Sequence, residues 1–210
     1  EIKVNDQSAK PSLKLNLGDR LMIKLPPSTP NSLLAEDIPL DIIYQDDDLL
    51  VIDKPAGMTV HPAPGHQSHT LANAILSFIA NPLDSGDRQR PGIVHRLDKD
   101  TSGIILVARN NAAYLNLSAQ FKSRSVSKTY LALVKGKLTP QDGVIEAHIG
   151  RDPAHRERMA VVTEEKGRQA MTNYHVVDYY GDYSLLEIKP ETGRTHQIRV
   201  HLKAIGHMVV

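Results

Sequence analysis

The sequence predicts an α+β fold with a mixed, mostly antiparallel sheet and flanking helices. Short apolar runs separated by Gly and Asp turns fill the second half of the chain, and this pattern is typical of strands. Few segments carry apolar residues at helical spacing, and these segments do not alternate regularly with the strands. Consecutive strands joined by short turns favour antiparallel pairing, so a doubly wound α/β fold is not expected.

The periodicity of apolar residues places each element. A helix is predicted over 71–79, where positions 71, 74, 75, 78 and 79 are apolar. Asn110 or Asn111 is expected to cap a helix that runs to about residue 122, and Thr195 to cap a helix over 195–205. Strands are predicted over 49–52, 103–108, 126–134, 144–149, 159–162, 170–177 and 183–189.

Length and composition exclude several classes of protein. The chain has 210 residues, 40% of them hydrophobic and 23% charged, which suits one packed domain with a smaller unit attached. It contains no Cys, so a disulfide framework and a thiolate metal site are excluded. No apolar run approaches the ~18 residues needed to span a bilayer, and no signal peptide is visible. We therefore expect a cytoplasmic protein that does not engage a membrane.

The chain divides into three parts. Residues 1–25 alternate in the manner of hairpin strands around a turn at Gly18, but so short a unit cannot bury much core by itself. The Pro-rich stretch that follows indicates a linker over 26–40. Residues 41–210 carry the α+β pattern and form the main domain.

The formal net charge of +1 conceals an uneven distribution of charge. Residues 31–60 hold seven acidic side chains and one basic one, whereas residues 88–130 hold eight basic and two acidic ones. The charge therefore predicts a cationic surface around the second segment and an acidic surface elsewhere, which suits local binding of an anionic partner.

A polar segment over 91–103 lies between two strand-like runs. Asp98 stands between Arg96 and Lys99, either of which could keep the carboxylate ionised. A loop held by strands is a common place for catalytic groups, but a salt-bridged turn in which Asp98 or Thr101 caps the next element fits the same residues. The predicted helix over 195–205 also allows two interpretations. Arg199 and Lys203 give it a cationic face, which suits either the binding of an anionic partner or simple exposure to solvent.

Taken together, these segments resemble the RluA/RluD family of pseudouridine synthases. The resemblance extends from about residue 41 to 208, with five motifs in the family's order. The motifs lie at 53–62 (DKPAGMTVHP), 95–103 (HRLDKDTSG), 127–132 (SKTYLA), 149–159 and 192–201 (TGRTHQIRVH).

The resemblance implies a pseudouridine synthase fold and an isomerase that converts uridine in RNA to pseudouridine. Its substrate would be large-subunit ribosomal RNA, it would act as a monomer, and it would need no cofactor and no metal. Residues 1–25 resemble the second half of a small RNA-binding domain of the S4-like type. By comparison with the family, the catalytic domain is expected to be truncated at its C-terminus.

The resemblance also assigns roles to particular residues. Asp98 matches the essential carboxylate, which either attacks C1′ or removes the 2′ proton. Arg199 matches its ion-pair partner, Tyr130 the tyrosine that stacks on the uracil, and Ile198 an apolar wall beside the base. Arg96 matches the residue that fills the stack once the base has flipped out. The remaining expected RNA contacts are His95, Lys99, Thr101, Lys189 and Arg194.

Two other functions remain open. A glycoside- or nucleoside-cleaving hydrolase would need a second carboxylate near Asp98, and Asp100 is the nearest candidate. A catalytically silent RNA-binding module would have no need of Asp98, Tyr130 and Arg199 together.

Overall fold

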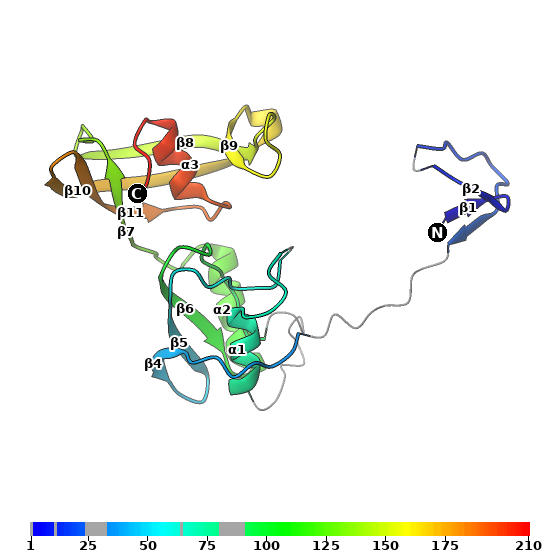
Figure 1. Cartoon of the computed structure of the whole chain (residues 1–210), viewed down its shortest axis with the longest axis horizontal. Helices are drawn as coiled ribbons and strands as arrows, with labels where there is room; N and C mark the ends of the chain where they lie inside the picture. The colour runs from blue at the N-terminus through cyan, green and yellow to red at the C-terminus, as the bar shows by residue number, and fades with distance from the viewer. Residues whose placement is uncertain (1, 11, 24–32, 64, 80–90) are drawn as a thin grey trace.

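The computed structural model describes residues 2–10, 12–23, 33–63, 65–79 and 91–210. Their strands form three separate sheets, and every pairing between strands is antiparallel (Figure 1). The predicted α+β class with mostly antiparallel strands is confirmed. Within the described ranges, no helix has both the length and the apolar character needed to span a bilayer.

A small sheet forms near the N-terminus. Its strands are β1 (Ile2–Val4), β2 (Gln7–Ser8) and β3 (Leu21–Ile23), in the order β2-β1-β3. Val4 is its one buried apolar side chain among the described residues, in agreement with the expectation that this unit has little core. Residues 24–32, which include the whole Pro-rich stretch and the first part of the predicted linker, lie outside the described ranges.

The first half of the main domain packs two helices against a three-stranded sheet. Its elements are β4 (Asp41–Gln45), β5 (Leu49–Lys54), α1 (Leu71–Phe78), β6 (Gly103–Ala108) and α2 (Asn111–Ser123). Alternate residues of β5 are buried, so that Leu50 and Ile52 meet Leu71 and Ile75 of α1 in one apolar core. Asn110, one of the two residues that the sequence offers as a cap, caps α2 by accepting a hydrogen bond from the Ala113 N–H.

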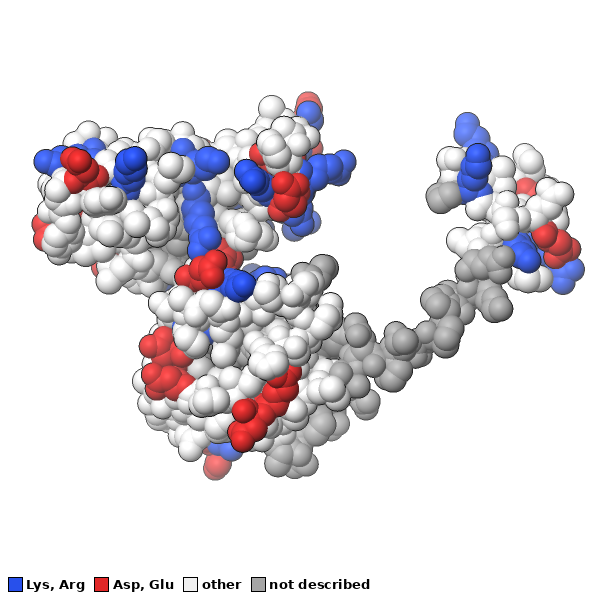
Figure 2. Space-filling view, viewed as in Figure 1, with Lys and Arg blue, Asp and Glu red and all other residues white. Residues whose placement is uncertain are grey.

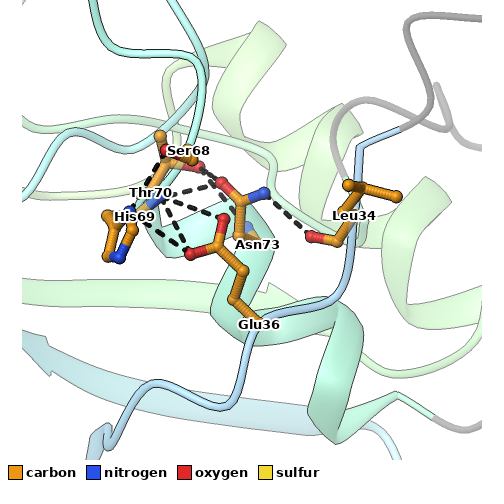
Figure 3. A network of polar contacts seen from close by, with 6 residues as sticks. All are labelled: Leu34, Glu36, Ser68, His69, Thr70 and Asn73. Atoms are coloured by element: carbon orange, nitrogen blue, oxygen red, sulfur yellow. Dashed lines mark hydrogen bonds and ion pairs between the residues drawn. The ribbon is translucent and has the colours of Figure 1, made fainter.

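The start of α1 is tied to the segment that precedes β4 (Figure 3). Thr70 and Asn73 form a reciprocal capping box, and the Asn73 amide donates to the carbonyl oxygen of Leu34 at 2.8 Å. The backbone N–H of His69 donates to both carboxylate oxygens of Glu36, at 3.1 and 3.2 Å. These bonds fix residues 33–40 along the helix and so complete one side of the core.

The second half packs one helix across a five-stranded sheet of order β7-β11-β10-β8-β9. Its elements are β7 (Tyr130–Lys135), β8 (Asp142–Arg151), β9 (Met159–Val162), the short 3-10 helix η1 (Glu164–Lys166), β10 (Arg168–Tyr180), β11 (Tyr183–Pro190) and α3 (Gln197–Ala204). Leu202 of α3 is fully buried against Leu186 and Ile188 of β11. The face of the sheet that carries these residues therefore faces α3, and the alternate residues face away from it.

Strands β5, β8 and β10 extend two or three residues further than predicted at one or both ends, and two other boundaries are wrong. Residues 126–129 are not part of a strand, and β7 begins at Tyr130. The N-cap of α3 is His196 rather than Thr195, and no side chain caps this helix. Gln197 explains the second difference, because its side-chain oxygen accepts from the Thr192 hydroxyl and from the Arg194 N–H. These bonds hold the preceding turn in place of a Thr cap.

Tyr130 lies where the two halves meet. The chain passes from α2 to β7 through residues 124–129 (Figure 1), and Tyr130 packs against both the β4–β6 core and the β7–β11 core. Figure 2 shows an open notch between the halves, with mainly acidic side chains on the visible face of the β4–β6 half. Basic side chains are more frequent over the half that holds β7–β11 and α3.

Gly92 provides a test of how tightly the segment before β6 is held. Its φ is +69°, its carbonyl accepts from the Ala108 N–H, and an added Cβ would overlap the Ala108 carbonyl oxygen. We expect Gly92→Ala to lower the free energy of unfolding by ~3 kcal/mol. Gly181→Ala is the matched control, since φ is +58° but the added Cβ meets nothing within 4 Å. Its loss should be ~1 kcal/mol, from backbone strain alone. Equal losses in urea unfolding would contradict the packing explanation.

Candidate active site

The loop that carries Asp98 is anchored on both sides. Before Asp98, Ile93 and Leu97 are buried in the first core, and Ile93 forms an antiparallel bridge with Val107 of β6. After it, the backbone N–H of Thr101 donates to the carbonyl oxygen of Asp98 at 3.2 Å and closes a turn. The Asp98 side chain is 26% exposed, so its carboxylate is held at the surface by a loop that cannot easily move.

His95 fixes the same loop from inside the chain. Its Nε2 accepts a hydrogen bond from the backbone N–H of Leu106 at 2.8 Å, and its ring stacks on Phe121 with centroids 4.6 Å apart. Burial, and secondly the charge of Lys128, lowers the pKa of His95 to about 4. The neutral imidazole therefore joins the loop to β6 and α2. The expected RNA contact of His95 stays a prediction.

Lys54 is a residue of this region to which the sequence analysis assigned no role. It ends β5 and is fully buried, and its ammonium donates to three backbone carbonyls: Pro55 at 2.8 Å, Met58 at 2.9 Å and Lys99 at 3.1 Å. All three N–H donors are thus satisfied. Burial lowers the pKa of Lys54, while the charges of Asp100 and Asp98 oppose that shift. The Lys-Pro sequence at the end of a buried strand is the signal that could have identified it.

Two basic side chains at the start of α3 approach Asp98 from the other half. Arg199 Nε lies 3.9 Å from Asp98 Oδ2, and His196 Nε2 lies 3.9 Å from Asp98 Oδ1. With Lys54, they place basic groups around the carboxylate, but none of the three belongs to residues 88–130, so the cationic surface expected from that segment stays a prediction. Arg88 and Arg90, which the same prediction included, lie outside the described residues.

Tyr130 completes the group. Burial raises the pKa of its phenol, and the negative charge of Asp98 raises it further. Ile198, beside Arg199, packs against the core of the second half. The structure thus brings together Asp98, Tyr130 and Arg199, although they are 32 and 69 residues apart along the chain.

The other residues that were predicted to contact RNA do not all lie beside Asp98. Arg96 and Lys99 are exposed on the Asp98 loop, and Lys99 Nζ lies 3.4 Å from His66 Nε2. Arg194 Nε donates to the Gln169 carbonyl. Lys189 pairs with Glu187 at 2.7 Å and follows the buried Ile188, so it lies on the sheet face away from α3. Lys189 is therefore not placed beside Asp98.

His95 should make stability depend on pH. Between pH 6.5 and 4 the unfolded chain binds a proton at His95 that the folded chain does not, so stability falls as the pH falls through this range. At pH 5 the loss relative to pH 7.5 should be ~2 kcal/mol from this group. Urea unfolding of the wild type and His95→Gln at both values measures it. The same pH dependence in both proteins would contradict the assignment.

Replacement of the buried Lys54 should lower the stability of the fold. Lys54→Met keeps most of the length of the side chain but removes the buried charge and its hydrogen bonds to three carbonyls, of which that of Lys99 retains the Gly57 N–H as a donor. We expect a loss of ~3 kcal/mol in the free energy of unfolding. Lys99→Met removes a neighbouring exposed ammonium and should change stability by less than ~0.5 kcal/mol. A small loss in the Lys54 variant would show that water reaches these carbonyls.

Comparisons with known proteins all find members of one family. The RNA pseudouridylate synthase family profile matches residues 48–204. An uncharacterised RNA pseudouridine synthase of Aquifex aeolicus is 45% identical over 98% of this chain and 65% of its own length. Ribosomal large subunit pseudouridine synthase D of Pseudomonas aeruginosa is 43% identical over 100% of this chain and 63% of its own.

A solved structure agrees in fold. Human RNA pseudouridylate synthase domain containing 1 superposes with a TM-score of 0.65 and 32% identity, covering 82% of this chain and 67% of that one. The chain spans about two thirds of the length of the curated relatives it matches. With the profile matching most of the described main domain, the chain belongs to the RNA pseudouridine synthase family.

Proposed function

We propose that this protein isomerises uridine in RNA to pseudouridine, with large-subunit ribosomal RNA as the substrate. The observation that carries the proposal is the placement of one partly exposed carboxylate, Asp98, between two basic side chains and the half-buried Tyr130. The family supports the reaction class, and relatives named for the ribosomal large subunit support the choice of RNA.

The reaction exchanges one bond for another. The glycosidic bond from N1 to C1′ breaks, the uracil turns, C5 bonds to C1′, the C5 proton leaves and N1 gains a proton. Atoms and electrons balance within the nucleotide, so the chain's own residues need only bind, orient and move protons. A uridine in a stack must first be flipped out, and the exposed planar guanidinium of Arg96 suits the vacated place.

Asp98 must be ionised whether it attacks C1′ or removes the 2′ proton. Arg199 supplies the fixed positive charge that an ionised carboxylate needs in a partly closed site. In the hydrolase alternative the partner would be a second carboxylate, whereas the ion-pair partners that the described residues give Asp98 are His196 and Arg199. The arrangement therefore favours the isomerase.

Tyr130 is protonated at neutral pH, as any tyrosine is, and burial and Asp98 raise its pKa further, which makes the phenol harder to ionise. In the free enzyme its hydroxyl is therefore a donor, and its ring offers a face for the uracil. If Asp98 forms an ester with C1′, its negative charge disappears. The contribution of Asp98 to the raised pKa of Tyr130 is then lost at the stage when the C5 proton must leave.

We further propose that residues 2–23 contribute to RNA binding as part of a small S4-like domain. Support comes from the predicted hairpin pattern, which the β1–β3 sheet reproduces, and from its basic residues Lys3, Lys10, Lys14 and Arg20. A cytoplasmic location and action as a monomer stay predictions.

Release of tritium from C5-labelled uridine in large-subunit ribosomal RNA tests the reaction. The wild type should release tritium, and Asp98→Asn should lower the rate at least ~1000-fold because the amide can neither attack C1′ nor accept a proton. Asp100→Asn is the matched control, two residues away on the same exposed turn, and should stay within a few-fold of the wild type. No release by the wild type would overturn the isomerase; an active Asp98→Asn would overturn the role of Asp98.

A further inference from the structure

His196 occupies an unusual position for a helix cap. It precedes α3 with φ +55° and ψ +24°, in the left-handed region, and its side chain makes no capping hydrogen bond. Ser, Thr, Asp and Asn are the usual caps, and they adopt extended backbone angles. A non-glycine residue in the left-handed region costs ~1 kcal/mol, and such strain persists where the surroundings enforce it.

The surroundings that enforce it are centred on Gln197. Its side chain is 5% exposed and makes four hydrogen bonds: it accepts from Thr192 Oγ1 and the Arg194 N–H, and donates to the Met171 carbonyl and Thr172 Oγ1. The turn before α3 is thereby fixed to β10. This fixed turn holds the imidazole of His196 over the junction between the halves, where it meets Asp98.

His196 and Arg199 contact different oxygens of the same carboxylate. His196 faces Oδ1 and Arg199 faces Oδ2, each at 3.9 Å. The terminal torsion of an Asp side chain is broad, so one ion pair leaves the carboxylate plane free to turn. A second partner on the other oxygen selects one orientation of the carboxylate, because both contacts are kept only when each oxygen faces its own basic side chain.

We propose that His196 is a positioning residue that orients the carboxylate of Asp98, with Arg199 as the second holder. The inference rests on the proposed function, because it gives Asp98 the catalytic role. The remaining charged or titratable groups placed around the carboxylate are Lys54, Asp100 and Tyr130. Among the described residues, none of these three forms a hydrogen bond or ion pair with Oδ1, so the orientation from that side depends on His196.

Two substitutions separate the effect of the His196 side chain from the effect of its strained backbone. His196→Gly removes the imidazole and also the backbone strain, so its thermal stability should equal or exceed that of the wild type. Its kcat for tritium release should fall by ~10-fold, while KM changes less than ~2-fold, because the orientation of Asp98 acts on the chemical step. His196→Gln keeps an N–H donor on a side chain of similar reach, and should retain kcat within ~3-fold of the wild type.

Each possible result either supports or excludes the positioning role of His196. A stable His196→Gly with unchanged kcat would show that His196 is only a helix residue. A raised KM with unchanged kcat would make it an RNA contact instead, and a His196→Gln as slow as His196→Gly would exclude orientation through a donor. Asp98→Asn, measured in parallel, distinguishes these failures from failure of the proposed function: if that variant is active, the premise is wrong whatever His196 does.

Discussion

The buried ammonium of Lys54 is the group on which the geometry of the site depends. A lysine with no contact with solvent is tolerated only when its three donors are satisfied, and here the acceptors are backbone carbonyls of two different loops. Since one acceptor is the carbonyl of Lys99, directly after Asp98, the charge that stabilises the end of β5 also fixes the loop of the carboxylate. The Gly57 N–H donates to the same Lys99 carbonyl at 2.9 Å and strengthens the connection.

The site is then assembled across the junction of two halves with separate cores. Asp98 comes from the half with α1 and α2, whereas His196 and Arg199 come from α3, which packs on the other sheet. Tyr130 belongs to both cores and stands where the chain crosses between them. The half with α1 and α2 supplies the negative charge of Asp98 on a rigid loop. The half with α3 supplies the basic side chains at the start of that helix.

Local features could be predicted from the sequence and long-range ones could not. Apolar spacing predicted the helix that the structure places at Leu71–Phe78, and Asn110 was recognised as a cap, because both depend on neighbouring residues. Spacing alone left Asp98 between a salt-bridged turn and a catalytic loop, since its partners lie about 100 residues later; the resemblance supplied Arg199 as the partner. Lys54 was missed because one of its acceptors, the Lys99 carbonyl, lies 45 residues later, and the Lys-Pro sequence at the end of a buried strand was its local signal. The start of α3 was misplaced because the bonds of Gln197 to β10 replace a local cap.

The two separations of 3.9 Å around Asp98 have a consequence for the strength of the contacts that hold its carboxylate. They suit ion pairs but are about 1 Å longer than direct hydrogen bonds between charged groups. A small approach of one half toward the other converts both into short bonds at the same moment. The separations therefore leave both contacts room to shorten while each basic side chain keeps the same oxygen of Asp98.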